Sequence, residues 1–193
     1  MEGIIENIEI AGIASCVPKH FEDNMDYGNV LGERRVKRQI RLTGIRKRHT
    51  SNKNQRASDL AMKATEKLLA ELDWKKEDIG VLIYMTQSAD YLIPSTAISP
   101  PPAIALQERM GLSKEVIAFD VNLGCSSFGY GVHIAASMMN TMPACKKALC
   151  LVADRVADME SKRLLNADTI SFSLLTGSAA SAVGIEKKQG KQI

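Results

Sequence analysis

The chain has 193 residues, an apolar share of 45%, a charged share of 24% and a formal net charge of +3. This composition predicts a packed core rather than a disordered chain, and the small net charge does not indicate a nucleic-acid binder. No apolar stretch approaches the ~20 residues that a bilayer span needs. The first seven residues carry two Glu and no basic residue, which is not typical of a signal peptide. We therefore expect a cytoplasmic protein without a membrane span.

Strands and helices are predicted to alternate along the chain. β-branched residues predict a strand over 4–14, and Asn24 is the expected cap of a helix over 25–42 that Gly44 ends. Apolar residues at helical spacing predict a second helix, with Ser58 as its expected cap. Further strands are predicted at 79–86, 116–121, 148–153 and 179–185, and further helices at 103–110 and 126–142. Buried strands separated by helices predict an α/β fold, with a mainly parallel sheet covered on both faces.

The four cysteines are Cys16, Cys125, Cys145 and Cys150. They form no C-x-x-C pair and have no His at zinc-finger spacing, so neither a metal site nor a disulfide framework is predicted. Cys125 follows a buried strand and an Asn/Gly turn, where the next helix is expected to begin. Unpaired N–H groups at a helix start favour a thiolate, and this position suits covalent acyl transfer through a thioester. The alternative is a small buried cysteine that only fills space.

No histidine has a position that argues for a catalytic base. His133 lies eight residues beyond Cys125 on the same expected helix, which separates the two by ~12 Å. His20 falls in an expected loop, and His49 ends a basic cluster. A cysteine hydrolase or acyltransferase that uses His20 or His49 is nevertheless one hypothesis, although the G-x-C-x-G pattern of α/β-hydrolases is missing.

The basic cluster places eight Lys and Arg, with no acidic residue, between Arg34 and His49. Such a patch is suited to steering an acidic partner, either the phosphates of CoA or the acidic helix of a carrier protein. The alternative is a solvated helix face. Neither an interleaved aromatic platform nor a known binding motif indicates nucleic acid.

Four sequence blocks occur in an order and spacing typical of one enzyme family. They are TGIRKRH at 43–49, TQSADYLIPSTA at 86–97, DVNLGCSSF at 120–128 and LLTGSAASA at 174–182. Together they resemble the β-ketoacyl-[acyl-carrier-protein] synthase III family of thiolase-like condensing enzymes. The resemblance covers nearly the whole chain, but only the first half of a family member.

The resemblance implies a thiolase-like fold, in which two similar halves pack into five layers, usually in a dimer. Residues 1–193 would form its N-terminal half. Cys125 would take the acyl group from acyl-CoA or acyl carrier protein, before a decarboxylative condensation with a malonyl thioester. The backbone N–H of Cys125 would supply one oxyanion-hole donor. The catalytic His and Asn would come from a C-terminal half or partner subunit, in a homo- or hetero-dimer, and no tightly bound cofactor is implied.

The same resemblance implies three further functional residues. Arg46 and Arg38 would contact the cofactor part or carrier of the thioester, and Ile93 would lie in the substrate pocket, with a buried loop residue as the alternative. Arg38 stands where many members carry a Trp that stacks on the adenine of CoA. Ser127 stands where the family usually has Gly, so we expect it to crowd the turn after Cys125. A second hypothesis is a non-catalytic subunit that binds or scaffolds a thioester.

Overall fold

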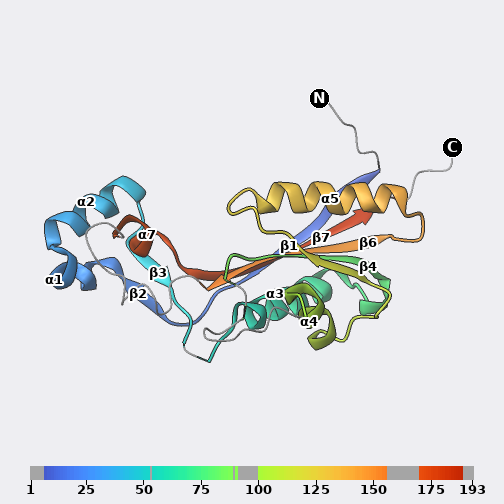
Figure 1. The fold of residues 1–193 in the computed structure, drawn as a ribbon, viewed down its shortest axis with the longest axis horizontal. Coiled ribbons are helices and arrows are strands. Elements are labelled where there is room, and N and C mark those ends of the chain that lie inside the picture. The colour runs from blue at the N-terminus through green and yellow to red at the C-terminus, as the bar shows by residue number, and fades with distance from the viewer. Residues whose placement is uncertain (1–6, 53, 89, 91–99, 156–169, 189–193) are drawn as a thin grey trace.

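A five-stranded mixed sheet forms the centre of the molecule (Figure 1). The computed structural model describes residues 7–52, 54–88, 90, 100–155 and 170–188. The sheet has the order β1-β7-β6-β4-β5. Its strands are β1 (Ile8–Cys16), β4 (Ile79–Met85), β5 (Ile117–Asp120), β6 (Lys147–Arg155) and β7 (Ser178–Lys187). β4 pairs in parallel with β5 and β6, whereas β7 pairs antiparallel with both β6 and β1. The predicted α/β fold with a mainly parallel sheet is therefore confirmed.

Helices cover both faces of this sheet. α3 (Ala57–Leu72) and α4 (Pro102–Arg109) pack on one face, and α5 (Ser127–Thr141) packs on the other (Figure 1). A short 3-10 helix, η2 (Lys76–Asp78), leads into β4. β4 sends side chains into the cores on both sides, which explains its nearly continuous apolar sequence.

α5 lies close to β4 at Gly131. A Cβ at this position would overlap the sulfur of Met85, so a larger residue would require the Met85 side chain to shift.

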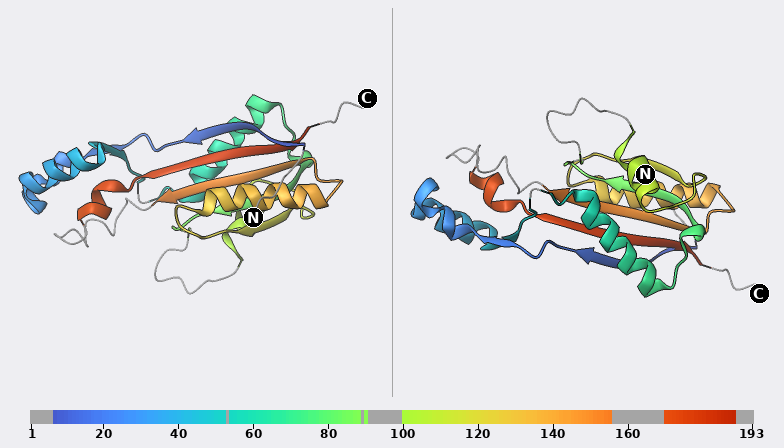
Figure 2. Two further views of the ribbon diagram at one scale, coloured as in Figure 1. Left: turned by 90° about the horizontal axis from the view of Figure 1, so that it is seen from above. Right: turned by 90° about the horizontal axis from the view of Figure 1, so that it is seen from below.

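A smaller group of elements, which we call the lobe, lies beyond one end of the sheet (Figures 1 and 2). It consists of β2 (Phe21–Asp23), η1 (Asn24–Tyr27), α1 (Gly28–Leu31), α2 (Glu33–Thr43), β3 (Lys47–His49) and α7 (Ile170–Leu175). β2 and β3 form an antiparallel two-stranded ribbon. Tyr27, Leu31, Val36 and Leu174 form the small core of the lobe. Neither the ribbon nor α7 was predicted from the sequence.

The helix predicted over 25–42 is divided in the structure. Gly32 has φ +87°, in the left-handed region, and separates α1 from α2. The N–H of Met25 donates to the carboxylate of Asp23 at 2.9 Å, so the prediction that Asn24 is the cap is wrong. Gly44 ends α2 as predicted, with φ +72° and its N–H donating to the carbonyl of Ile40.

The start of α3 also differs from its prediction. The helix begins at Ala57 with Arg56 as its N-cap, and Ser58 lies in its first turn rather than at its cap. Asp59 accepts a hydrogen bond from the Arg56 N–H at 2.8 Å, which stabilises the helix start.

Candidate functional site

Cys125 lies in a tight turn between β5 and α5 and is exposed to solvent. Gly124 has φ +59°, a conformation that glycine adopts without strain. The N–H of Ser126 donates to the carbonyl of Leu123 at 3.3 Å, and that of Ser127 donates to the carbonyl of Gly124 at 3.1 Å. The thiol therefore stands two residues before α5, at the carboxyl end of a parallel strand. It is not a space-filling core residue.

Ser127 closes this turn rather than crowding it. Its side chain is buried, and its hydroxyl oxygen accepts a hydrogen bond from the Leu123 N–H at 2.7 Å. The expected steric conflict is wrong, because the hydroxyl fits as a hydrogen-bond partner of the turn.

Three exposed apolar side chains lie close to Cys125 in the chain. Leu123, Phe128 and Tyr130 are 54%, 41% and 57% exposed. Figure 1 shows α5 lying over the sheet with no other described element on its outer side.

The other three thiols have different surroundings. Cys145 and Cys150 are buried, and Cys16 is half-buried, so Cys125 is the exposed member of the four. Burial raises the pKa of Cys145, and it raises the pKa of Cys150 to about 12. Both buried thiols are therefore held in the protonated, unreactive form.

The three histidines make no hydrogen bond to the Cys125 thiol in the described part of the chain. His49 contacts the carbonyl of Pro18 through Nδ1 at 2.8 Å, and its ring meets the edge of Phe21. His20 and His133 are exposed. Within residues 7–52, 54–88, 90, 100–155 and 170–188, no histidine hydrogen-bonds to Cys125, and no group of three or more His, Cys, Asp or Glu is arranged to hold a metal ion. The same part of the chain holds no helix of the length and apolarity needed to cross a membrane.

Arg46 lies in the lobe with its side chain 67% exposed. Its Nε donates to the carboxylate of Asp23 at 3.1 Å. The N–H of Met25 and the Arg46 guanidinium together hold the pKa of Asp23 below its usual value. The ion pair leaves the two terminal nitrogens of Arg46 without a contact among the described residues, so they are available to an anion.

Arg38 belongs to a basic stripe on α2. The stripe, which we call the basic helix face, consists of Arg34, Lys37, Arg38 and Arg41, and it lines a shallow concave surface together with Glu33. Helical spacing places these four side chains on one side of α2. Lys37 pairs with Glu33 at 2.9 Å, whereas the three arginines have no acidic partner in the described part of the chain.

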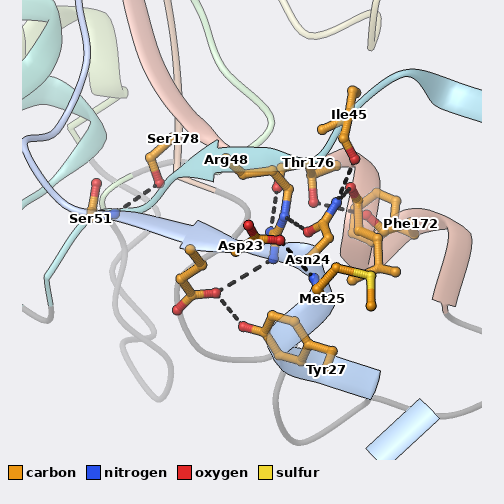
Figure 3. Close-up of polar contacts among 12 residues, drawn as sticks. Asp23, Asn24, Met25, Tyr27, Ile45, Arg48, Ser51, Phe172, Thr176 and Ser178 are labelled. Carbon is orange, nitrogen blue, oxygen red and sulfur yellow. Dashed lines mark hydrogen bonds and ion pairs between the residues drawn. The ribbon is translucent and has the colours of Figure 1, made fainter. Parts of the chain in front are cut away.

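Arg48 has a different role from the rest of the basic cluster, because its side chain is buried (Figure 3). Its Nε donates to Asn24 at 2.7 Å and its Nη1 to the carbonyl of Thr176 at 2.8 Å. Its Nη2 pairs with Glu22 at 3.5 Å, and the guanidinium lies 5.7 Å from the ring centroid of Tyr27. The sequence cluster therefore contains one structural arginine.

Asn24 completes this network at the centre of the lobe (Figure 3). Its Nδ2 donates to the carbonyls of Ile45 and Leu174, both at 2.9 Å. Tyr27 donates its hydroxyl to Glu22, and burial followed by this carboxylate raises the pKa of Tyr27 to about 12. The network holds the segment before β3 against the segment before β7. Arg46 lies between Ile45 and Arg48, which both belong to this network. The remaining predicted site residue, Ile93, lies outside the described residues.

Comparisons with known proteins agree on one family. A family model described as 3-oxoacyl-[acyl-carrier-protein (ACP)] synthase III matches residues 119–193. The β-ketoacyl-[acyl-carrier-protein] synthase III of Fusobacterium nucleatum is 30% identical over 190 residues, which are 96% of this chain and 53% of that protein. A putative 3-oxoacyl-[acyl-carrier-protein] synthase 3 of Campylobacter jejuni is 27% identical over 97% of this chain and 50% of its own length.

Solved structures of similar proteins share the fold of this chain. The 3-oxoacyl-(acyl-carrier protein) synthase of Burkholderia xenovorans superposes with a TM-score of 0.84 and 31% identity, over 96% of this chain and 50% of that one. The OleA protein of Xanthomonas campestris, crystallised with lauric acid and lauroyl-CoA, has a TM-score of 0.79 at 22% identity, covering 95% of this chain and 57% of that one, and supports the fold alone. The chain spans about half the length of the curated relatives it matches.

Proposed function

We propose that this chain, whose sequence and fold are similar to those of β-ketoacyl-[acyl-carrier-protein] synthase III enzymes, as its four sequence blocks predicted, is the nucleophile-bearing half of a thiolase-like condensing enzyme of that family. Residues 1–193 would form the N-terminal thiolase-like domain. The proposed reaction is acyl transfer from a thioester to Cys125, followed by decarboxylative Claisen condensation with a malonyl thioester once the C-terminal half is present. Such a reaction belongs to fatty acid synthesis in the cytoplasm.

The single observation that carries this proposal is the exposed thiol of Cys125 in its glycine-containing turn before α5. In the proposed step the thiolate attacks the carbonyl of the donor thioester, the bond between that carbonyl and the donor sulfur breaks, and the donor leaves as a thiol after taking up a proton. The new thioester keeps the acyl group activated for the condensation. Cys125 would also supply its backbone N–H to the oxyanion, as one of two donors.

Among the described residues, no histidine is placed to act as a catalytic base for Cys125. No histidine contacts Cys125 within the described ranges, which supports the proposal that the His and Asn of the active site come from the C-terminal half or a partner subunit. The apolar side chains of Leu123, Phe128 and Tyr130 support the same arrangement, because a second half packed on the outer side of α5 would cover them.

The donor is proposed to be acyl-CoA or an acyl carrier protein, with no tightly bound cofactor. Arg46, with its free terminal nitrogens, and Arg38, on the basic helix face, would contact the phosphates of CoA or the acidic surface of a carrier protein. Ile93 would line the acyl pocket of a dimer.

A non-catalytic thioester-binding subunit is the second candidate, and the observation that favours it is that no histidine in the described part of the chain hydrogen-bonds to Cys125. A reconstitution assay separates the two. An acyl donor and malonyl carrier protein are incubated with this chain alone, with a C-terminal half alone, and with both. We expect the ketoacyl product only from the pair. Product from this chain alone would contradict the proposal, and a pair that gives neither product nor an acyl group on Cys125 would favour the non-catalytic subunit.

A further inference from the structure

The turn that carries Cys125 is closed by a side chain as well as by backbone contacts. Two backbone hydrogen bonds, from Ser126 to Leu123 and from Ser127 to Gly124, form its frame. The third contact runs from the Leu123 N–H to the hydroxyl oxygen of Ser127 and, at 2.7 Å, is the shortest of the three. Leu123 and Ser127 stand on either side of the nucleophile, so this bond fixes the span that contains it.

We propose that Ser127 is a positioning residue, whose hydroxyl holds the Cys125 turn in the shape that acyl transfer needs. This proposal rests on the proposed role of Cys125. Ser127 is itself held firmly, because it is buried and begins α5. Its hydroxyl therefore fixes the Leu123 amide, and with it the residues before Cys125, relative to α5. Acyl transfer depends on such a fixed geometry, since the sulfur must reach the carbonyl while the N–H of Cys125 faces the developing oxyanion.

The turn has few other constraints in the described part of the chain. Gly124, at φ +59°, is the residue type with the most conformational freedom, and the neighbouring Ser126 makes no side-chain hydrogen bond to the helix start. A residue without a hydroxyl at position 127 leaves the Leu123 N–H without its acceptor. Local opening of the turn then becomes easier.

Amide hydrogen exchange at Leu123 tests the contact directly. In Ser127→Ala, we expect the Leu123 amide to exchange about tenfold faster than in the wild type. Ser127→Thr keeps the hydroxyl and is expected to restore protection. Ser126→Ala is the matched control, since it removes a hydroxyl one residue away that makes no helix-capping bond, and its exchange at Leu123 is expected to stay within twofold.

Two reactions of Cys125 test the positioning role. We expect Ser127→Ala to slow acylation of Cys125 by an acyl-CoA or acyl carrier protein about tenfold, while alkylation by iodoacetamide changes less than twofold, because alkylation develops no oxyanion. Ser127→Thr is expected to restore acylation. Unchanged Leu123 exchange in Ser127→Ala, or an equal loss of acylation and alkylation, would overturn the role of Ser127. Failure of the wild-type chain to accept an acyl group, both alone and with a C-terminal half supplied, would instead contradict the proposed function, whatever the exchange result.

Discussion

Arg46 and Arg48 are separated by one residue but have opposite surroundings. The Arg46 side chain is 67% exposed and makes one ion pair with Asp23, whereas the Arg48 side chain is 3% exposed and is bonded on every side. A buried guanidinium is retained only with its full set of partners, because an unpaired charge in the interior is strongly unfavourable. We therefore assign stability to Arg48 and propose ligand contact for Arg46.

Methionine substitutions separate these two roles. We expect Arg48→Met to lower the free energy of unfolding by about 3 kcal/mol, since it removes the buried guanidinium that Asn24 and Glu22 contact. Arg46→Met is expected to lower it by less than about 1 kcal/mol, because an exposed ion pair contributes little. Urea denaturation of both variants measures the difference, and equal losses would show that Arg48 is not the anchor.

The sequence located this basic cluster but did not distinguish its members. The partners that bury Arg48 include the carbonyl of Thr176, 128 residues away, and no local pattern reports such a contact. In contrast, the position of Cys125 in a turn before a helix was predicted from the sequence, because the Asn/Gly signal and the helix start are both local.

Cys150 provides a test by pH. Burial raises the pKa of its thiol from 9.0 to about 12, so folding favours the protonated form. The stability that this contributes is fully present below about pH 9 and is lost as the pH rises from 9 towards 12. Urea denaturation at several pH values is expected to show that the free energy of unfolding falls less steeply above pH 9 in Cys150→Ala than in the wild type. The pKa of Tyr27 is raised from 10.0 to about 12, so both proteins lose a further part of this free energy at higher pH. Parallel curves for the two proteins would contradict this assignment.

At the scale of elements, the sheet was predictable and the lobe was not. β4, β5, β6 and β7 appear where short apolar runs predicted strands, because such a run is a local signal in the sequence. β2 and β3 have three residues each, with the sequences FED and KRH, and are defined only by pairing with each other. Their formation depends on contacts distant in the sequence, which a local pattern cannot report.

The basic helix face of α2 leads to a prediction about donor binding. We expect Arg38→Glu combined with Arg41→Glu to weaken binding of an acyl carrier protein or of acyl-CoA about tenfold at low ionic strength, with a weaker dependence on salt. Lys63→Glu, on the exposed side of α3, is the matched control and is expected to bind as the wild type. Titrations of both donors at two salt concentrations measure the effect.

Comparing the two donors shows which of them binds the basic helix face. A loss for the carrier protein alone would identify it as the partner of α2, and a loss for CoA alone would place the nucleotide there. Equal binding by wild type, the double variant and the control would show that α2 is only a solvated helix face.

At the scale of the whole molecule, α5 leaves part of its side of the sheet, at β1, apolar and exposed. Gly12 and Ala14 of β1 face α3, so Ile13 between them lies on the face that carries α5, and it is 57% exposed. Phe128 and Tyr130 add exposed apolar area on α5 itself. A surface of this kind is typical of a contact with another domain or subunit.

This surface predicts the behaviour of the chain alone. We expect self-association or poor solubility when the chain is purified by itself, and a defined complex when a C-terminal half is supplied. Sedimentation velocity over a range of concentrations measures both. A stable monomer at all concentrations would argue against an interface on this side of the sheet.

The central claim is that Cys125 accepts an acyl group, and the mass of the protein after exposure to a thioester tests it most directly. The chain is incubated with an acyl-CoA and separately with an acyl carrier protein, with and without a C-terminal half, and the intact mass and the modified peptide are measured. The account predicts one added acyl group, located on Cys125 and absent from Cys125→Ser. An unmodified wild-type chain under all four conditions, or an acyl group that persists in Cys125→Ser, would contradict it.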